Sequence, residues 1–388
     1  MKPIAILAFA ICFVFLSHMV AQAAAEPETT VIFAAGKDGY PSVRIPALLA
    51  TRRGTLLAVA EGRAAQADQA ANQIILERSL DNGRTWGPLQ VIAHDGNNAL
   101  NNPCLVQDLP SGRILLMIQR YPAGRKEFNG RLKPGIKGNE VVRNYLLSSD
   151  DDGATWTAPK DVTDTTKAAE AITVASGPGI GIQLERGPHR GRLIIPFNQR
   201  VGSFWDVRAV FSDDHGATWR LGDIVPDARA VNAKGRTTSM VNEVQMVELE
   251  DGSVRLNSRR ADNRPFRKTA VSRDGGQTWG KIEQVEQLPD PACMGSILRY
   301  DFAAGQGRGR IVYSGPHGPG RTKGTIRVSY DDGRTWPVNK VLCPGQFAYS
   351  CLARLKDGSV GILYETGKKS AYETVTFSRF PLDWLEGR

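Results

Sequence analysis

The sequence predicts an all-β chain folded as a six-bladed β-propeller of four-stranded antiparallel blades, and two repeating patterns predict it. The first is the skeleton Ser-x-Asp-x-Gly-x-Thr-Trp, which occurs five times, at residues 79–86, 149–156, 212–219, 272–279 and 329–336. The second is a short apolar hairpin around a glycine, which occurs six times, at Gly54, Gly112, Gly191, Gly252, Gly309 and Gly358. Repetition of one four-stranded unit along a chain is typical of propellers.

Each copy of the skeleton, which we call a box, predicts a self-capped turn. Asp and Thr side chains bond nearby backbone, Gly permits positive φ, and Trp plugs the space beneath the turn. Hairpin, loop, strand, box and strand make one unit, and successive hairpin glycines are 58, 79, 61, 57 and 49 residues apart. No box follows the sixth hairpin. We therefore expect the last blade to end with a strand at 372–377 and to gain its fourth strand from residues 30–34.

Residues 1–25 have the pattern of a secretory signal peptide. Lys2 precedes an apolar run at 4–16 and the segment Ala21-Gln22-Ala23, so cleavage is expected near Ala23 to Ala25. The apolar run is too short to anchor the chain in a bilayer. We expect export to the periplasm or the medium, without stable membrane insertion. No compositional break divides residues 26–388, which are expected to form a single propeller domain with one long, mobile loop at 121–140.

The composition favours an anionic partner. The formal net charge is +9 and the pI is near 9.4. The basic residues are scattered and no nucleic-acid reader motif is present, so an acidic glycan is favoured over nucleic acid. The four histidines after the signal peptide lack metal-ligand spacing, and we expect no metal and no cofactor. Cys343 and Cys351 could form a disulfide in an exported protein, although buried free thiols are equally compatible with the sequence.

Strand direction predicts where the charged side chains meet. In an up-and-down blade the hairpin and box turns share one end, so residues far from both turns gather at the other end. Glu243 and Arg259 lie eight residues on either side of Asp251 and should therefore be neighbours across their hairpin. The same reasoning brings together, from different blades, Arg44, Asp68, Glu243, Arg259, Arg321 and Tyr349, with Arg63 at the end of the first return strand.

These residue types suit one kind of ligand. Three guanidiniums make a permanently positive pocket whose planar forks match a carboxylate. A tyrosine beside a glutamate is an activated phenol, and an aspartate in a loop can donate a proton. On a sugar with a carboxylate at its anomeric carbon, a carboxylate nucleophile would be repelled, whereas a neutral tyrosine would not. Each of these residues alone could be explained as a member of a surface ion pair or as a solvated side chain. Only their convergence at one end of the propeller indicates a site.

With this set of residues the chain resembles the bacterial secreted exo-α-sialidases (neuraminidases) with Asp-box (BNR) repeats. The likeness covers nearly all of residues 26–388. It includes the ordered segments Arg44-Ile45-Pro46, Glu61-Gly62-Arg63, 67–74, 242–243, 256–259, 321–327 and 349–350. The resemblance implies the six-bladed sialidase fold and a single catalytic domain.

The resemblance also implies a role for each residue. Tyr349 matches the nucleophile, Glu243 its activating base and Asp68 the acid/base. Arg44, Arg259 and Arg321 match the carboxylate-binding triad, and Arg63 matches the arginine that reaches a ring hydroxyl. The chain departs from many relatives in having Asn102-Pro103 where they have Asp-Pro, which alters contacts near O4 of the sugar. Trp205 is a candidate for the wall around the N-acyl group, with a structural role as the alternative.

The implied activity is removal of terminal sialic acids from glycoproteins, glycolipids and oligosaccharides by a monomer. The implied mechanism retains configuration through a tyrosyl-enzyme intermediate. Three alternatives stay open: transfer to another sugar (a trans-sialidase), internal attack that gives an anhydro-sugar (an intramolecular trans-sialidase), and a non-catalytic propeller that binds acidic glycans. The joint presence of Asp68, Glu243 and Tyr349 favours an enzyme over the last of these.

Overall fold

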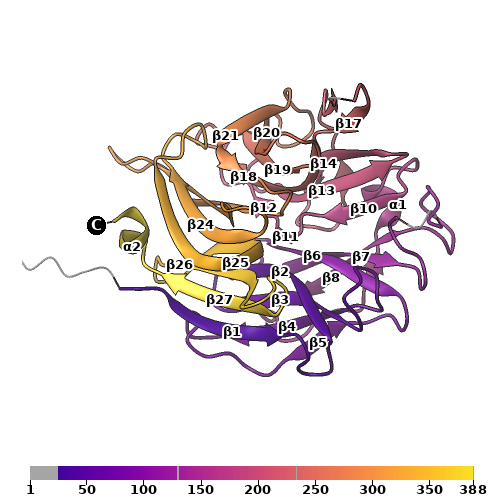
Figure 1. Ribbon diagram of the computed structural model, residues 1–388, viewed down its shortest axis with the longest axis horizontal. Coiled ribbons are helices and arrows are strands. Elements are labelled where there is room, and N and C mark those ends of the chain that lie inside the picture. The colour runs from indigo at the N-terminus through magenta and orange to yellow at the C-terminus, as the bar shows by residue number, and fades with distance from the viewer. Residues whose placement is uncertain (1–24, 129–130, 233, 388) are drawn as a thin grey trace, which may run out of the picture.

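The computed structural model describes residues 25–128, 131–232 and 234–387, which are almost entirely β-structure outside the loops. Two short helices occur among them, α1 (Thr163–Thr166) and α2 (Leu382–Glu386). In Figure 1 the sheets follow one another around a common centre, from indigo through magenta and orange to yellow. The chain is therefore all-β with a propeller-like arrangement of sheets. The predicted signal peptide lies, except for Ala25, outside the described residues.

Four blades are separate sheets of four or five strands. The first contains β2 (Ser42–Ala50), β3 (Leu56–Arg63), β4 (Gln73–Ser79) and β5 (Gln90–Ala93). The second contains β6 (Ala99–Gln107), β7 (Ile114–Tyr121), β8 (Arg143–Ser149) and β9 (Lys160–Asp161), with β11 (Gly179–Ile180) parallel to β6. The third contains β10 (Thr173–Ser176), β12 (Ile182–Gln183), β13 (Leu193–Val201), β14 (Phe204–Ser212) and β15 (Arg220–Leu221). The fourth contains β18 (Val241–Glu248), β19 (Val254–Arg260), β20 (Phe266–Ser272) and β21 (Glu283–Pro289), and a hairpin of β16 (Arg229–Val231) and β17 (Thr237–Ser239) precedes it.

The last part of the chain forms one continuous sheet of seven strands, in the order β1-β27-β26-β25-β24-β23-β22. Its members are β22 (Ser296–Asp301), β23 (Arg310–Pro316), β24 (Thr322–Ser329), β25 (Val338–Arg354), β26 (Val360–Gly367), β27 (Thr374–Phe380) and β1 (Glu28–Ala34). β1 pairs antiparallel with β27, which confirms that an N-terminal strand completes the last sheet. Strand pairing thus gives four separate blades and a seven-stranded sheet, and the count of six blades stays a prediction.

The box turns have the predicted self-capping geometry. In the box at 329–336, Asp331 accepts hydrogen bonds from Ser329 Oγ (2.8 Å), the Thr335 amide (2.8 Å) and Thr335 Oγ1 (2.6 Å). The same three bonds recur at Asp81, Asp151, Asp214 and Asp274. Gly333 has a φ of 81°, a conformation that glycine adopts without the strain that a side chain would add.

Five of the six predicted hairpin glycines lie in turns with positive φ, but the sixth does not. β22 and β23 are joined by residues 302–309, and Gly309 lies outside the left-handed region. The prediction of a tight turn at Gly309 is therefore wrong. A Cβ atom on Gly309 would lie 2.9 Å from the Ala303 amide nitrogen, so a close approach of the backbone, rather than a turn, disfavours a side chain there.

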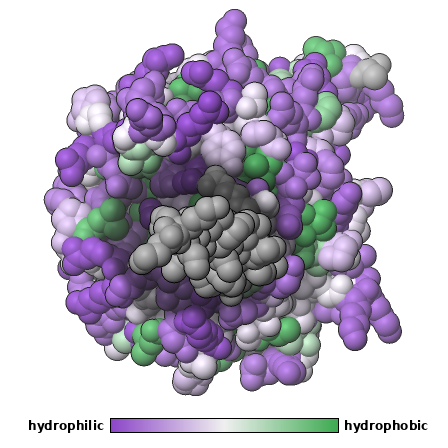
Figure 2. Space-filling view, turned by 90° about the vertical axis from the view of Figure 1, so that its left-hand side faces the viewer, coloured by the Kyte–Doolittle hydropathy of each residue, from purple (hydrophilic) through white to green (hydrophobic). Residues whose placement is uncertain are grey.

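The box tryptophans join neighbouring parts of the core. Trp219, Trp279 and Trp336 are buried beneath their turns. Trp86 of the first box packs edge to face against Phe377 of β27, with ring centroids 5.2 Å apart, so side chains as well as β1 connect the first and last sheets. On the face shown in Figure 2, hydrophobic residues of the described chain lie scattered among hydrophilic ones. Within the described ranges, no helix has the length and apolarity needed to cross a membrane.

The cysteines that follow the predicted signal peptide carry free thiols. Cys104, Cys293 and Cys351 are buried and Cys343 is half-buried. Cys343 and Cys351 both lie in β25, where eight residues of extended chain separate them by about 25 Å. That separation is far beyond the reach of a disulfide, so the possible bridge between them does not form.

Candidate active site

The seven predicted site residues line one cavity of about 310 Å³. They come from three of the sheets, which lie near both ends and in the middle of the chain. Arg44 is in β2, Arg63 in β3, Asp68 in the β3–β4 loop, Glu243 in β18, Arg259 in β19, Arg321 directly before β24 and Tyr349 in β25. The cavity lies a strand's length from the hairpin and box turns, as the strand directions predict. Asn102 and Trp205 line the same cavity.

Register shifts in the strand pairing orient these side chains toward the cavity. β2, β6, β18 and β25 each have a shift beside the cavity, between Arg44 and Ala47, Asn101 and Cys104, Val241 and Val244, and Phe347 and Ser350. Ile45 and Asn102 have φ values of 62° and 53°, which side-chain-bearing residues adopt only at a cost. A bulge bends its strand and re-aims the neighbouring side chains, and bulges are over-represented next to active sites. Four strands thus break their pairing to present side chains to the cavity.

Tyr349, Glu243 and Arg259 form a compact hydrogen-bonded cluster. The Tyr349 hydroxyl donates to Glu243 Oε1, and Arg259 Nη1 donates to Glu243 Oε2 (2.6 Å) and to the Tyr349 oxygen (2.8 Å). Burial raises the pKa of Tyr349 well above its usual value. The phenol is therefore neutral at pH 7, and Glu243 is placed to take its proton as it reacts. The hairpin argument that made Glu243 and Arg259 neighbours is confirmed.

Three arginines surround the tyrosine ring. The guanidinium carbons of Arg44 and Arg321 lie 5.1 and 5.2 Å from the centroid of the Tyr349 ring. Arg259 Nε is buried and has no hydrogen-bond partner within the described part of the chain. A buried unsatisfied donor is costly unless a ligand satisfies it. The three guanidinium groups thus line one cavity and can bind a carboxylate there.

Glu365 holds both Arg44 and Tyr349 in place, and it was not identified as a site residue from the sequence. This carboxylate is fully buried in β26. It accepts two parallel bonds from Arg44 (Nε, 2.9 Å; Nη2, 3.0 Å) and one from each of the Ile45 amide (2.9 Å) and the Tyr349 amide (3.2 Å). Glu365 therefore neutralises Arg44 on its inner side and ties the bulges of β2 and β25 together.

Arg63 connects the candidate acid to a second buried carboxylate. Arg63 is only 1% exposed and pairs with Glu61 (2.6 Å) and with Asp68 (2.8 Å), whereas the Asp68 side chain is 60% exposed. Glu61 also accepts the Asn102 amide (2.7 Å), and its burial raises its pKa. Asp68 is thereby held at the open side of the cavity, where a leaving group can reach it. Glu61 is the second carboxylate whose role the sequence does not predict, since Glu61 appears there only as part of the segment Glu61-Gly62-Arg63.

Glu127 brings another titrating group into the cavity from the predicted long loop. Its carboxylate accepts a bond from Thr173 Oγ1 (3.2 Å), and Arg200 Nη2 donates to its main-chain oxygen (2.8 Å). Burial raises the pKa of Glu127 to about 7. The loop is described at residues 122–128 and 131–142, and its mobility stays a prediction. No spacing in the sequence points to Glu127.

The raised pKa of Glu127 predicts a pH-dependent step in binding an anion. A carboxyl whose pKa is raised keeps its proton until the pH passes that value, so Glu127 becomes charged only as the pH rises through about 7. We expect KM for an anionic glycoside to rise about fivefold across this range, since two carboxylates in one cavity repel by about 1 kcal/mol. Glu127→Gln should lack this step. Wild-type and variant KM values measured from pH 5 to pH 9 check it, and parallel profiles would contradict it.

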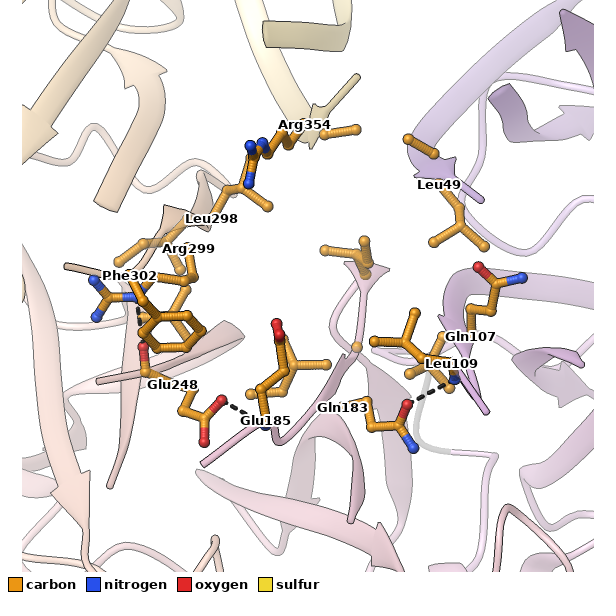
Figure 3. A pocket seen from close by; sticks show the side chains of 18 residues that line it. Leu49, Gln107, Leu109, Gln183, Glu185, Glu248, Leu298, Arg299, Phe302 and Arg354 are labelled. Carbon is orange, nitrogen blue, oxygen red and sulfur yellow. Dashed lines mark hydrogen bonds between the residues drawn. The ribbon is translucent and has the colours of Figure 1, made fainter. Parts of the chain in front are cut away.

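A second cavity, of about 320 Å³, lies at the opposite end of the inner strands. Figure 3 shows its walls, with Leu49, Leu298 and Phe302 among the apolar members. Its polar groups bond to each other: Glu248 accepts the Glu185 amide (2.7 Å), and Gln183 accepts the Leu109 amide (2.7 Å). None of the seven predicted site residues lines it.

Comparison with known proteins assigns the family. A family profile described as "BNR repeat-like domain" matches residues 54–362. Mouse (Mus musculus) sialidase-2 is 30% identical over 382 residues, which cover 89% of this chain and 94% of the mouse protein. The chain belongs to the sialidase family. The sialidase of Micromonospora viridifaciens is 37% identical over 365 residues, which cover 91% of this chain.

Solved sialidase structures agree with the propeller-like fold. A structure titled "Hadza microbial sialidase Hz136" has a TM-score of 0.77 and 28% identity, over 90% of this chain and 68% of that one. An intramolecular trans-sialidase from Ruminococcus gnavus also has a TM-score of 0.77, over 91% of this chain and 97% of that one, but at 21% identity it supports the fold alone. This sialidase-family chain spans 53% and 61% of the lengths of the curated relatives from Micromonospora viridifaciens and Bacteroides fragilis.

Proposed function

We propose that the protein is an exo-α-sialidase that removes terminal sialic acids from glycoconjugates with retention of configuration. One observation carries the proposal. A neutral, buried tyrosine is hydrogen-bonded to Glu243 and Arg259 in a cavity that also holds Arg44, Arg321 and Asp68. A positive cavity with an uncharged nucleophile suits an anomeric carbon that bears a carboxylate. Sialidase names among the relatives support the same substrate class.

The proposed mechanism uses only side chains in this cavity. Arg44, Arg259 and Arg321 bind the substrate carboxylate, and Asp68 protonates the glycosidic oxygen as the bond to C2 breaks. The Tyr349 oxygen attacks C2 while its proton passes to Glu243, which gives an aryl glycoside. Asp68, now ionised, takes a proton from water, whose oxygen attacks C2 and displaces the phenolate. The phenolate regains its proton from Glu243, and two inversions give net retention.

Product identification tests the proposal directly. The protein is incubated with the α2,3- and α2,6-isomers of sialyllactose, and the products are followed by proton NMR. We expect free sialic acid to appear first as its α-anomer, with lactose in equal amount. A sialylated acceptor would indicate a trans-sialidase, and an anhydro-sugar would indicate an intramolecular trans-sialidase. Binding without any product would favour the non-catalytic glycan-binding propeller.

Arg321→Lys is expected to weaken capture of the substrate. Arg321 donates to the Tyr372 hydroxyl (2.8 Å) and to the Ala292 carbonyl (3.1 Å), which orient its planar fork. Lysine keeps the charge but loses the fork, so kcat/KM should fall about 30-fold, or about 2 kcal/mol. The measurement is kcat/KM on sialyllactose, with Lys323→Arg as a control that changes an exposed cation two residues away. An unchanged kcat/KM for Arg321→Lys would remove Arg321 from the carboxylate site.

We also propose the finer points of architecture and location that the resemblance implies. Residues 338–346 of β25 pair with β24 and residues 346–354 pair with β26. The seven-stranded sheet can therefore be divided at β25 into two four-stranded blades, which supports a total of six. The signal-peptide pattern at 1–25 supports export. We further propose that residues 26–388 act on sialylated glycans as a single catalytic domain and as a monomer.

A further inference from the structure

The loop that contributes Glu127 also carries a cluster of cations. Residues 122–128 and 131–140, which we call the basic loop, contain Arg125, Lys126, Arg131, Lys133 and Lys137, with Glu127 and Glu140 as the acids. The formal charge of the basic loop is therefore +3. Lys126, Lys133 and Lys137 are exposed. Phe128 is also exposed, by 76%, and both Glu127 and Phe128 line the cavity. The catalytic mechanism uses none of these cations.

The basic loop is held against the body of the protein. Leu132 is buried in a cluster of core side chains from the second and third blades. The Lys167 ammonium donates to the carbonyls of Gly135 (2.7 Å) and Val142 (3.1 Å), and Arg125 pairs with Glu140. These anchors hold the backbone segments that carry the exposed lysines against the body of the protein.

The basic loop lies on the side where a leaving group leaves the cavity. Asp68 must contact the glycosidic oxygen in order to protonate it, so the part of the substrate beyond that oxygen passes beside Asp68. The next residue, Gln69, accepts a bond from the Glu127 amide (3.4 Å), which joins the Asp68 segment directly to the basic loop. A chain that extends outward from Asp68 therefore passes Glu127 and Phe128, which line the cavity and belong to the basic loop.

We propose that the basic loop docks the outer sugars of a multiply sialylated chain, such as a linear oligomer of sialic acid, while the terminal sugar occupies the cavity. This inference rests on the proposed sialidase function. An oligomer of sialic acid carries one carboxylate on each sugar, and its repeating negative charge complements the exposed ammonium groups of the basic loop. Phe128 offers an aromatic face at the cavity rim against which the C–H groups of a sugar ring can pack. A neutral leaving group such as lactose would gain only the contact with Phe128.

The test compares two substrates in two charge variants. The loop variant is Lys126→Gln/Lys133→Gln/Lys137→Gln. The control variant, Arg53→Gln/Lys281→Gln/Lys356→Gln, removes the same charge from exposed residues at the end where the turns lie. At about 50 mM salt, where the Debye length exceeds 10 Å, the loop variant should lose about tenfold in kcat/KM on a sialic acid tetramer. Its kcat/KM on sialyllactose should stay within about twofold, and the control variant should change little on either substrate.

Salt and binding measurements separate the possible outcomes. The advantage of the wild type over the loop variant on the tetramer should disappear at about 1 M salt, where the Debye length is about 3 Å. Equal losses on both substrates, no loss on either, or an equal loss in the control variant would each overturn the inference. Dissociation constants for the tetramer, measured by calorimetry with Tyr349→Phe in both backgrounds, test docking without turnover. If the wild type hydrolysed neither substrate, the proposed function would fail, whereas a tenfold weaker tetramer affinity in the loop variant would still support docking.

Discussion

Tyr349→Phe is expected to lower kcat on sialyllactose by at least about 10³-fold while the protein remains folded. The substitution removes one oxygen atom, the one that lies between Glu243 and Arg259. Without it no covalent intermediate can form, and the remaining arginines can only bind the substrate. KM should change much less than kcat, since the carboxylate contacts come from the three guanidiniums. Steady-state kinetics and circular dichroism of wild type and variant provide the measurement.

Tyr372→Phe is the matched control for this prediction. Tyr372 lines the same cavity and also hydrogen-bonds an arginine, Arg321, but the Tyr372 hydroxyl has no carboxylate partner among the described contacts. Its loss should cost only a few-fold, mainly in KM. Wild-type turnover by Tyr349→Phe, or equal losses in the two variants, would show that Tyr349 is not the nucleophile.

The proposed mechanism needs Glu243 because the phenol of Tyr349 carries its proton in the free protein. Burial holds the pKa of Tyr349 well above its usual value, so the proposed nucleophile is uncharged in the free protein at neutral pH. A charged phenolate would bind well among three arginines but would also repel the substrate carboxylate. In the proposed mechanism the hydrogen bond to Glu243 resolves this conflict, because the proton would leave only as the new bond to C2 forms.

The sequence allowed much of this arrangement to be predicted because the boxes are a local pattern. Each box closes through bonds between residues no more than four positions apart, so its turn can be recognised without knowledge of the fold. Once the turns were placed, strand direction located the opposite end of each strand. Hairpin symmetry about Asp251 then paired Glu243 with Arg259, and the structure confirms that pair.

The residues that escaped prediction act through long-range contacts. Glu365 is 321 positions from Arg44, and nothing near Glu365 in the chain distinguishes it from any other strand glutamate. Glu61 was noticed only as part of a motif, whereas its burial and its bond to the Asn102 amide depend on the bulge in β6. The four bulges themselves have no sequence signature here, since only one extra residue distinguishes them from regular strand. The sequence also did not predict that β25 is a single strand of 17 residues that pairs with both β24 and β26.

Glu365→Gln is expected to lower both stability and activity, because this carboxylate is the buried counter-charge of Arg44. The substitution leaves Arg44 inside the protein without its bidentate partner, and a glutamine NH₂ group must then face Arg44 and either the Ile45 or the Tyr349 amide. Breaking a buried ion pair from one side costs about 3 kcal/mol of unfolding free energy. The bulges that present Arg44 and Tyr349 should also shift, and a displacement of about 1 Å in a site is worth about 10²-fold in kcat/KM. Urea unfolding and kinetics on sialyllactose measure the two effects.

Glu248→Gln separates the loss of stability from the loss of activity. Glu248 is also a buried carboxylate that accepts two backbone amides, those of Glu185 (2.7 Å) and Arg186 (2.8 Å), but it lies at the opposite cavity. Its substitution should destabilise the protein and leave kcat/KM within about twofold. If both variants lost activity in proportion to stability, Glu365 would have only a structural role. A further check is Arg44→Gln/Glu365→Gln: the double variant should be destabilised by less than the sum of the single variants, since neither charge is then left unpaired.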